Sequence, residues 1–535
     1  MTTARYSKNT ERLLLGILAV ISLLVTLYCQ YPLLTNKYAI NDDVRQEIYF
    51  YSNYNNSNLF RNDPITDYYR SWNPSGLNTF YYFASLFHDP IGVTKILPFF
   101  LCVFSALYMF GIGKILKGNL CGFLSGLLFI SLAWSREAFE VFGTGNGEDF
   151  AVVFCVMFLY YLLKKDLLKS SITLILLSLF HPSLLLICLL TQFLVLIIDC
   201  LKHNKSASKK LLGFMITLII IFLILWPKYL SGQIKLTKLK EMKAMEEFYP
   251  GGRKPLFFES SYERWTNYES GLAIDYPLRW LFGVASIALL VLRKKILKVM
   301  PPQLFYFIFI SFVLFGIANL FMYSLYGPSR YVRYPLPLFL IFIITLGVSE
   351  ITQKIKVSAG RIALITGFIA LIGLSFAPKL HAHYVVAPYP GLYRFLSTLP
   401  ESSLIAGHPV LMDDVPTFAK RIVFISQETS MPYYANFYPF IKKRTYDFFR
   451  AYYSNDLREI DDFFKKYNIT HMVVQKSNFS EDYIKRSQFY FNPFNAYVED
   501  IIKNRKKFAL MDVPQDSRLF ETEDVFVIAK DSLVF

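Results

Sequence analysis

The stretch LLLGILAVISLLVTLYC (residues 13–29) carries no charge, and after a short connection it is followed by YAINDDVRQE (residues 38–47), where two carboxylates are adjacent. An apolar run of this length is typical of a helix that crosses a bilayer. It lacks a small-residue cleavage site, so we interpret it as a retained anchor rather than a signal peptide. The acidic pair therefore lies close to a membrane surface.

Ten further apolar stretches follow the first. They lie near residues 95–116, 120–134, 150–163, 170–180, 183–200, 211–226, 277–292, 303–323, 331–348 and 362–376. Together they predict a mainly α-helical polytopic membrane protein with about 11 transmembrane helices. The stretches on either side of His181-Pro182 are two short spans or one re-entrant unit.

The composition argues against a soluble protein. Of 535 residues, 54% are hydrophobic and only 18% are charged, with a mean hydropathy of +0.35, whereas soluble domains are about 25% charged. The six cysteines fall in or at the edge of apolar stretches and form no CxxC pair, which argues against a zinc site and a disulfide framework.

The basic excess has a regular pattern. The net charge is +16, and basic residues gather at the N-terminus and in alternate connections, namely residues 114–117, 164–169, 202–210, 293–298 and 354–361. Cytoplasmic loops concentrate Lys and Arg. We therefore expect a cytoplasmic N-terminus and no nucleic-acid partner.

With an odd number of spans, the C-terminal part is extracytoplasmic. We expect a transmembrane domain over residues 1–376, with outer loops at 30–94, 135–149 and 228–276, and a soluble extracytoplasmic α/β domain over 377–535. Strand-like runs at 404–406, 422–425, 472–474 and 525–529 and an amphipathic helix at 457–467 support the α/β class. The long third outer loop is typical of a lid or binding loop.

The acidic pair Asp42 and Asp43 precedes two amphipathic stretches, residues 44–60 and 77–87, which we expect to lie in the membrane interface. One interpretation is that Asp42 caps the following helix, because Asp is favoured at that position. Another is that a carboxylate faces a cavity that a membrane-borne substrate reaches. Both can hold at once.

The expected architecture combines an anchor, an outer loop with an acidic pair, interfacial helices, basic cytoplasmic loops and a soluble outer tail. It resembles the GT-C fold of membrane glycosyltransferases. These include protein O-mannosyltransferases, lipid A aminoarabinose transferases and oligosaccharyltransferases. The resemblance covers most of the chain in architecture, although its motifs are short. The chain lacks the Trp-Trp-Asp motif expected of an oligosaccharyltransferase tail.

The resemblance implies that Asp42 or Asp43 is the general base that deprotonates the acceptor. A sugar on a polyprenyl phosphate has a leaving group that is stable as an anion, so the reaction needs a base more than an acid. The implied activity is transfer of a sugar from a polyprenyl-phosphate donor to an extracytoplasmic lipid, glycan or protein, with inversion in a single displacement.

The second outer loop carries further acidic residues beside three glycines. By resemblance, Glu137 or Glu140 contacts the acceptor or a metal, while Glu148 or Asp149 caps the fourth span. The alternative is a glycine-rich turn with solvated charge. Acidic pairs allow a divalent cation, although a polyprenyl monophosphate donor does not require one.

Three polar residues lie at membrane depth or at the outer rim. His181 is either functional or a helix-terminus histidine beside a proline. Arg330 and Arg333 lie three residues apart at the outer end of a span, where guanidinium groups suit phosphate recognition. We expect them to hold the lipid phosphate; the alternative is that they snorkel to the interface.

Two other functions remain open. A transporter or flippase is expected to show internal repeats and polar groups at mid-membrane, and we find no repeat. A non-catalytic scaffold of the same fold is the third hypothesis. The compartment is the plasma membrane if the host is bacterial, which we favour, or the endoplasmic reticulum otherwise.

Overall fold

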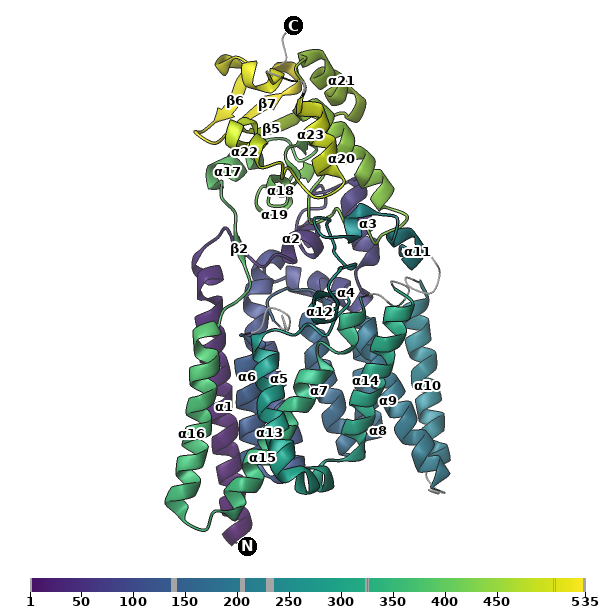
Figure 1. The fold of residues 1–535 in the computed structure, drawn as a ribbon, viewed down its shortest axis with the longest axis vertical. Helices are drawn as coiled ribbons and strands as arrows, with labels where there is room; N and C mark the ends of the chain where they lie inside the picture. Colours follow the sequence, from purple (N-terminus) through teal and green to yellow (C-terminus); the bar gives the residue numbers. More distant parts are fainter. Residues whose placement is uncertain are drawn as a thin grey trace.

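The computed structural model describes residues 2–135, 142–202, 207–227, 235–322, 325, 327–503, 505 and 507–532. Long helices run side by side at one end of the molecule, and a smaller part with a β-sheet lies at the other end (Figure 1). The N-terminus lies at the end of the bundle farthest from the sheet.

Each of the eleven apolar stretches corresponds to a helix of the bundle. These helices are α1 (Thr2–Thr35), α5 (Pro90–Lys117), α6 (Asn119–Ala133), α7 (Gly147–Leu163), α8 (Leu167–Phe180), α9 (Pro182–Leu201), α10 (Ala207–Leu225), α13 (Tyr276–Val299), α14 (Pro302–Leu320), α15 (Pro335–Lys354) and α16 (Ser358–Phe376). Within the described residues, six segments are long and apolar enough to cross a membrane: 8–35, 90–117, 182–201, 302–320, 328–354 and 358–379. α6 and α8 are shorter apolar helices.

Burial separates the centre of the bundle from its rim. The apolar window of the segment that contains α15 is 83% buried inside the protein, whereas that of α16 is only 17% buried. Large apolar side chains such as Leu290 on α13 and Leu374 on α16 are exposed. Apolar side chains on the outside of a helical bundle are stable only in lipid, so the chain is an integral membrane protein.

The first outer loop folds into short helices. They are α2 (Val44–Glu47), the 3₁₀ turn η1 (Tyr49–Tyr54), α3 (Pro64–Trp72) and α4 (Ser75–Ser85). The expected amphipathic stretches correspond to α2 with η1 and to α4, while α3 was not expected. Strand β1 (Ala39–Ile40) pairs antiparallel with β2 (Val385–Val386), which joins this loop to the chain beyond α16.

The C-terminal part contains a five-stranded mixed sheet in the order β4-β3-β5-β7-β6. Its strands are β3 (Leu404–Ala406), β4 (Ile422–Val423), β5 (His471–Gln475), β6 (Arg518–Glu521) and β7 (Val525–Ala529). β3 runs parallel to β4 and β5, and β7 runs antiparallel to β5 and β6. The expected helix over 457–467 is α21 (Leu457–Tyr467). The sequence thus predicted four of the five strands and missed β6.

The remaining short elements lie between the helices of the bundle or within the C-terminal part. They are α11 (Leu239–Met242), η4 (Glu246–Phe248), α12 (Ser261–Thr266), η5 (Pro328–Tyr331), η6 (Ala377–Lys379), α17 (Pro390–Thr398), α18 (Pro409–Met412), α19 (Val415–Phe418), α20 (Tyr438–Tyr452), η7 (Lys476–Phe479), α22 (Glu481–Lys485), α23 (Phe494–Lys503), η8 (Ala509–Asp512), η9 (Gln515–Ser517) and η10 (Lys530–Ser532). The third outer loop contacts the C-terminal part, where the Thr237 amide donates to the Tyr433 carbonyl at 2.9 Å.

Candidate active site

The glycine-rich segment before α7 is a closed loop held by one carboxylate. The buried Asp149 side chain accepts hydrogen bonds from the amides of Gly143, Thr144 and Gly145 at 3.1, 3.2 and 3.0 Å. Gly143 and Gly145 adopt φ values of +107° and +68°, which glycine reaches without strain. The described part of this loop is thus a glycine-rich turn, but its charge is not solvated as that interpretation expected, because Glu148 and Asp149 are buried.

Asn146 directly precedes α7, and its side-chain oxygen accepts two hydrogen bonds. Its Oδ1 accepts from the Glu148 amide at 2.8 Å and from the Thr144 hydroxyl at 2.8 Å. Asn146 is thus the N-cap of α7, and the expectation that Glu148 or Asp149 caps this helix is wrong. With Oδ1 occupied, Nδ2 points away from the helix and is available to donate.

Gly147 brings two helix ends together. A Cβ atom on Gly147 would lie 2.2 Å from the carbonyl oxygen of Phe180, the last residue of α8. Only glycine permits this approach, which places Glu148 beside His181. His181 is the N-cap of α9: its Nδ1 accepts from the Leu184 amide at 3.2 Å. His181 thus lies at a helix terminus beside Pro182, and the same residue also lines a cavity.

Glu148 binds both predicted arginines. Arg330 donates to Glu148 Oε1, Arg333 Nη1 lies 3.7 Å from Glu148 Oε2, and the Tyr334 hydroxyl donates to Oε2 at 2.6 Å. The arginines lie in and just after the 3₁₀ turn η5, before α15 begins, and not on a regular α-helix as we expected. They nevertheless converge on one carboxylate.

The first outer loop reaches the same place. Asn146 Nδ2 donates to Asp43 Oδ2 at 3.1 Å, and Asn146 also hydrogen-bonds the Glu47 side chain. Burial raises the pKa of Glu47 to about 7, although the Arg330 guanidinium and the Asn146 hydrogen bond oppose the shift. The carboxylates of Asp43 and Glu47 thus both contact the glycine-rich loop through the side-chain amide of Asn146.

Asp42 has a different environment from its neighbour. It forms an ion pair with Arg45, whose Nη1 also donates to Asp414 Oδ1 of the C-terminal part at 3.0 Å. α2 begins at Val44 with Asp43 at the N-cap position and no side-chain capping bond. The expectation that Asp42 caps this helix is therefore wrong, and Asp42 instead belongs to a link with the C-terminal part.

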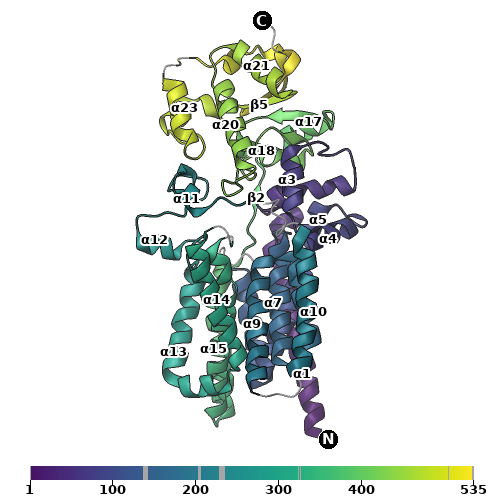
Figure 2. The ribbon, with the colours of Figure 1, turned by 90° about the vertical axis from the view of Figure 1, so that its right-hand side faces the viewer.

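These residues surround a cavity of about 590 Å³. Its polar wall consists of Glu47, Asn73, Asn146, Glu148, His181 and Arg330. Its apolar wall includes Leu185, Leu186 and Leu189 of α9 and Ile221 and Leu225 of α10, two helices that pack against each other in the bundle, with α9 also against α7 (Figure 2). Leu236 and Lys238 of the third outer loop complete the lining. A site with these two walls suits a ligand that is charged at one end and apolar along the other.

The predicted residues divide into three groups. Arg330 and His181 line the cavity, and Asp43 and Arg333 contact residues that line it. Asp42 faces Arg45. Glu137 and Glu140 lie outside the described residues.

Sequence reasoning missed Glu47 and Asn146 and gave Glu148 the wrong role. One signal was available for Glu47, because residues four apart share a helix face and Glu47 follows Asp43 by four positions.

The donor set gives little support for a resident metal ion. Within the described ranges, no group of three or more His, Cys, Asp and Glu side chains is arranged to hold one. Both Glu148 oxygens are already engaged by Arg330, Arg333 and Tyr334, and a cation there would compete with two guanidinium groups.

No protein-family model matches the chain, and no curated protein matches it either. Solved structures do. The apo oligosaccharyltransferase of Archaeoglobus fulgidus matches over 91% of this chain and 72% of its own, with 12% identity and a TM-score of 0.56. The same enzyme in complex with Zn and sulfate matches over 89% and 69%, with 12% identity and a TM-score of 0.53.

A third match is ArnT of Cupriavidus metallidurans in the apo state. It covers 99% of both chains at 11% identity, with a TM-score of 0.47. At such identities the similarity to the oligosaccharyltransferase concerns the fold alone. Together with the helical bundle, the short helices of the first outer loop and the outer sheet, it shows that this chain has the GT-C fold of membrane glycosyltransferases.

Proposed function

We propose that the chain is a glycosyltransferase that moves a sugar from a polyprenyl-phosphate donor to an acceptor on the outer side of the membrane. The observation that carries the proposal is the cavity with one charged and one leucine-rich wall. A polyprenyl-phosphate sugar needs both, because its phosphate requires cations and its chain requires an apolar path. The shared fold supports the same reaction class.

In this proposal Arg330 and Arg333 hold the donor phosphate. Glu148 keeps both guanidinium groups at one place before the donor arrives. The planar guanidinium binds a phosphate through two parallel hydrogen bonds. As the bond to the sugar breaks, negative charge grows on the phosphate, and the same two cations stabilise the departing polyprenyl phosphate.

The base we propose is a carboxylate of the first outer loop. Asp43 is favoured over Asp42, because Asp42 is paired with Arg45 whereas Asp43 contacts Asn146 at the cavity. Glu47 is a second candidate, since it lines the cavity itself and its pKa is raised to about 7, close to the working pH of a base. The base takes the acceptor proton while the acceptor attacks the sugar carbon opposite the phosphate, which inverts that carbon.

Several finer assignments belong to the same proposal. The acceptor is a lipid, a glycan or a protein, contacted by Glu137 or Glu140. All eleven apolar helices cross the membrane, the N-terminus is cytoplasmic, and residues 377–535 form an extracytoplasmic domain on residues 1–376. The host membrane is a bacterial plasma membrane, so the product belongs to the cell envelope. The proposed transfer reaction does not involve a metal ion.

Binding of a polyprenyl monophosphate to the purified chain tests the donor assignment. Replacing both cations, Arg330→Ala with Arg333→Ala, should weaken binding at least about tenfold, since each hydrogen bond between charged groups contributes about 1.5–3 kcal/mol. Native mass spectrometry of the protein with the added lipid measures this. An unchanged affinity contradicts the assignment.

Two further variants separate binding from folding. Arg330→Gln with Glu148→Gln removes one cation and one carboxylate together, so the net charge of the cluster is unchanged although Arg333 loses its contact with Glu148, and it should also weaken binding. Arg264→Gln, on the exposed surface of α12, should bind the donor as the natural chain does.

The base assignment has its own test. Asp43→Asn should abolish transfer while donor binding persists. Normal transfer by Asp42→Asn, Asp43→Asn and Glu47→Gln alike excludes a base in this loop.

A further inference from the structure

A second hollow is lined in part by residues near the N-terminal end of α1, which lies at the end of the bundle farthest from the sheet (Figure 1). It is a groove of about 780 Å³ between α1, α5 and α7. α1 contributes Glu11, Leu15, Gly16 and Ala19, α5 contributes the residues from Phe104 to Ile115 that face it, and the end of α7 contributes Tyr160, Tyr161 and Lys164. None of these residues has a part in the proposed transfer reaction.

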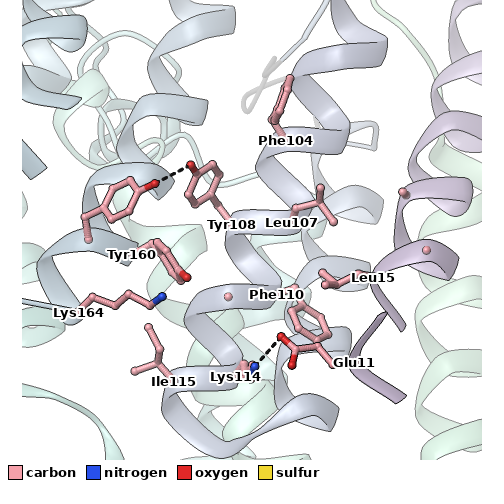
Figure 3. Close-up of a pocket in the computed structure, with 14 residues that line it drawn as sticks. Glu11, Leu15, Phe104, Leu107, Tyr108, Phe110, Lys114, Ile115, Tyr160 and Lys164 are labelled. Carbon is pink, nitrogen blue, oxygen red and sulfur yellow. Dashed lines mark hydrogen bonds and ion pairs between the residues drawn. The ribbon is translucent and has the colours of Figure 1, made fainter. Parts of the chain in front are cut away.

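The groove has the length of one membrane leaflet. On α5 its lining runs from Phe104 to Ile115, a rise of eleven residues or about 17 Å along a helix. The hydrocarbon core of a bilayer is about 30 Å thick. Figure 3 shows Lys114 and Lys164 toward one end of the groove and Phe104 toward the other. The groove therefore runs from the membrane surface to about the bilayer centre.

The walls leave room for a hydrocarbon chain. An added Cβ on Gly16 would meet no atom within 4 Å, so this glycine faces open space in the groove. Ala19 continues the same small-residue face of α1, since residues three apart are neighbours on a helix. Phe104 and Ile115 on the opposite wall are 52% and 39% exposed. Apolar walls with this exposure are stable when they are covered by lipid.

The mouth of the groove carries an excess positive charge. Lys114 is paired with Glu11 at 2.5 Å, whereas Lys164 lies over the Tyr160 ring, 4.5 Å from its centroid. In the part of the chain that the structure describes, no carboxylate lies within ion-pair distance of the Lys164 ammonium. Two lysines against one glutamate leave one positive charge at the level of the lipid headgroups.

We propose that this groove binds an anionic glycerophospholipid, with one acyl chain along Gly16, Ala19 and Phe104 and the phosphate on Lys164. The leaflet-long groove fits an acyl chain of that leaflet, and the uncompensated ammonium favours a headgroup with a net negative charge over a zwitterionic one. The site does not depend on the proposed transfer reaction. The occupant would hold α1 against α5 and α7 at the basic end of the bundle.

Lipid retention by the purified full-length chain tests this. The protein is incubated with equal amounts of phosphatidylglycerol and phosphatidylcholine, and bound lipid is counted by native mass spectrometry. We expect preferential retention of phosphatidylglycerol. Gly16→Leu should fill the groove and abolish the preference. Lys164→Gln should lower phosphatidylglycerol affinity about fivefold, the effect of one lysine near an anionic lipid surface.

Matched controls exist for both changes. Gly367 on α16 also has no atom within 4 Å of an added Cβ, so Gly367→Leu should retain phosphatidylglycerol as the natural chain does. Lys356→Gln removes an exposed lysine between α15 and α16 and should also have no effect. If Gly16→Leu fails to fold, Lys164→Gln alone tests the proposal, because Lys164 is exposed and its replacement should leave the fold intact. Equal retention of the two lipids, unchanged retention in Lys164→Gln, or replacement of phosphatidylglycerol by added polyprenyl phosphate overturns the proposal.

Discussion

Glu47 is a carboxylate that lines the cavity. Its pKa is raised to about 7 by burial, so below that pH it holds a proton and cannot accept one. If Glu47 acts as the base, the rate of transfer should rise with pH, bend near pH 7 and then become constant. Measurement of kcat/KM between pH 5 and about 9, the range in which such a group titrates, checks this.

Glu47→Gln supplies the control for that profile. It should remove the bend near pH 7 and lower the rate at least about a hundredfold. The amide has almost the shape of the carboxylic acid, so donor binding should persist. A bend that survives in Glu47→Gln assigns it to another group, and Asp43→Asn then shows whether that group is Asp43.

Single residues were predictable only where their chemistry was visible along the chain. Two arginines at the end of a membrane helix that we expect to face outward are unusual, and this singled out Arg330 and Arg333. Glu148 carries no such signal, because an acid at the start of a helix is ordinary. Its role follows from its contacts with Arg330 and Arg333, which lie 182 and 185 positions further along the chain. A pattern of neighbouring residues cannot reveal a contact between positions so far apart in the sequence.

At the scale of elements, the site depends on how closely the start of α7 approaches the end of α8. Gly147→Ala places a methyl group 2.2 Å from the Phe180 carbonyl oxygen, so the helices must separate and Glu148 must move away from His181. We expect a lower melting temperature and weaker polyprenyl phosphate binding. Differential scanning fluorimetry and native mass spectrometry measure the two effects.

Gly367→Ala is the matched control on α16, where an added Cβ meets no atom within 4 Å. In an open helix position, alanine is favoured over glycine by about 1 kcal/mol. This variant should be unchanged or slightly more stable. If Gly147→Ala behaves in the same way, the close approach of α7 and α8 is not what positions the site.

The helices of the bundle were predictable because a membrane demands a long apolar run for each one. The short helices of the outer loop were harder. α3 has only nine residues and depends on its Asp63 cap, which accepts from the amides of Ile65 and Thr66. β6 was missed because its four residues, Arg518–Glu521, begin and end with a charged side chain and form no apolar run. Such elements gain their stability from their neighbours, which the local sequence does not reveal.

At the scale of the whole molecule, Arg45 joins the first outer loop to the C-terminal part. It binds Asp42 and Asp414, and the Arg45 and Asp414 side chains are only 11% and 5% exposed. Removing one partner of a buried ion pair costs about 3–5 kcal/mol. Arg45→Gln should therefore lower the melting temperature and speed hydrogen exchange at residues 39–47.

The exposed pair Lys485–Glu481, with side chains 71% and 88% exposed, gives the comparison for that variant. Lys485→Gln should change stability by only about 0–1 kcal/mol. Equal effects of the two substitutions show that the C-terminal part does not hold the first outer loop in place.

The topology of the bundle decides on which side the reaction occurs. If an odd number of helices cross the membrane, Lys8 and Glu481 lie on opposite sides. Of the six native cysteines, five are buried and Cys200 is partly exposed, so Cys200→Ser gives a background with little labelling. In that background, a membrane-impermeant maleimide should label Glu481→Cys in intact cells but label Lys8→Cys only after permeabilisation. Labelling of both in intact cells requires an even number of crossings, and it places the C-terminal part, with the cavity beneath it, on the same side as the N-terminus.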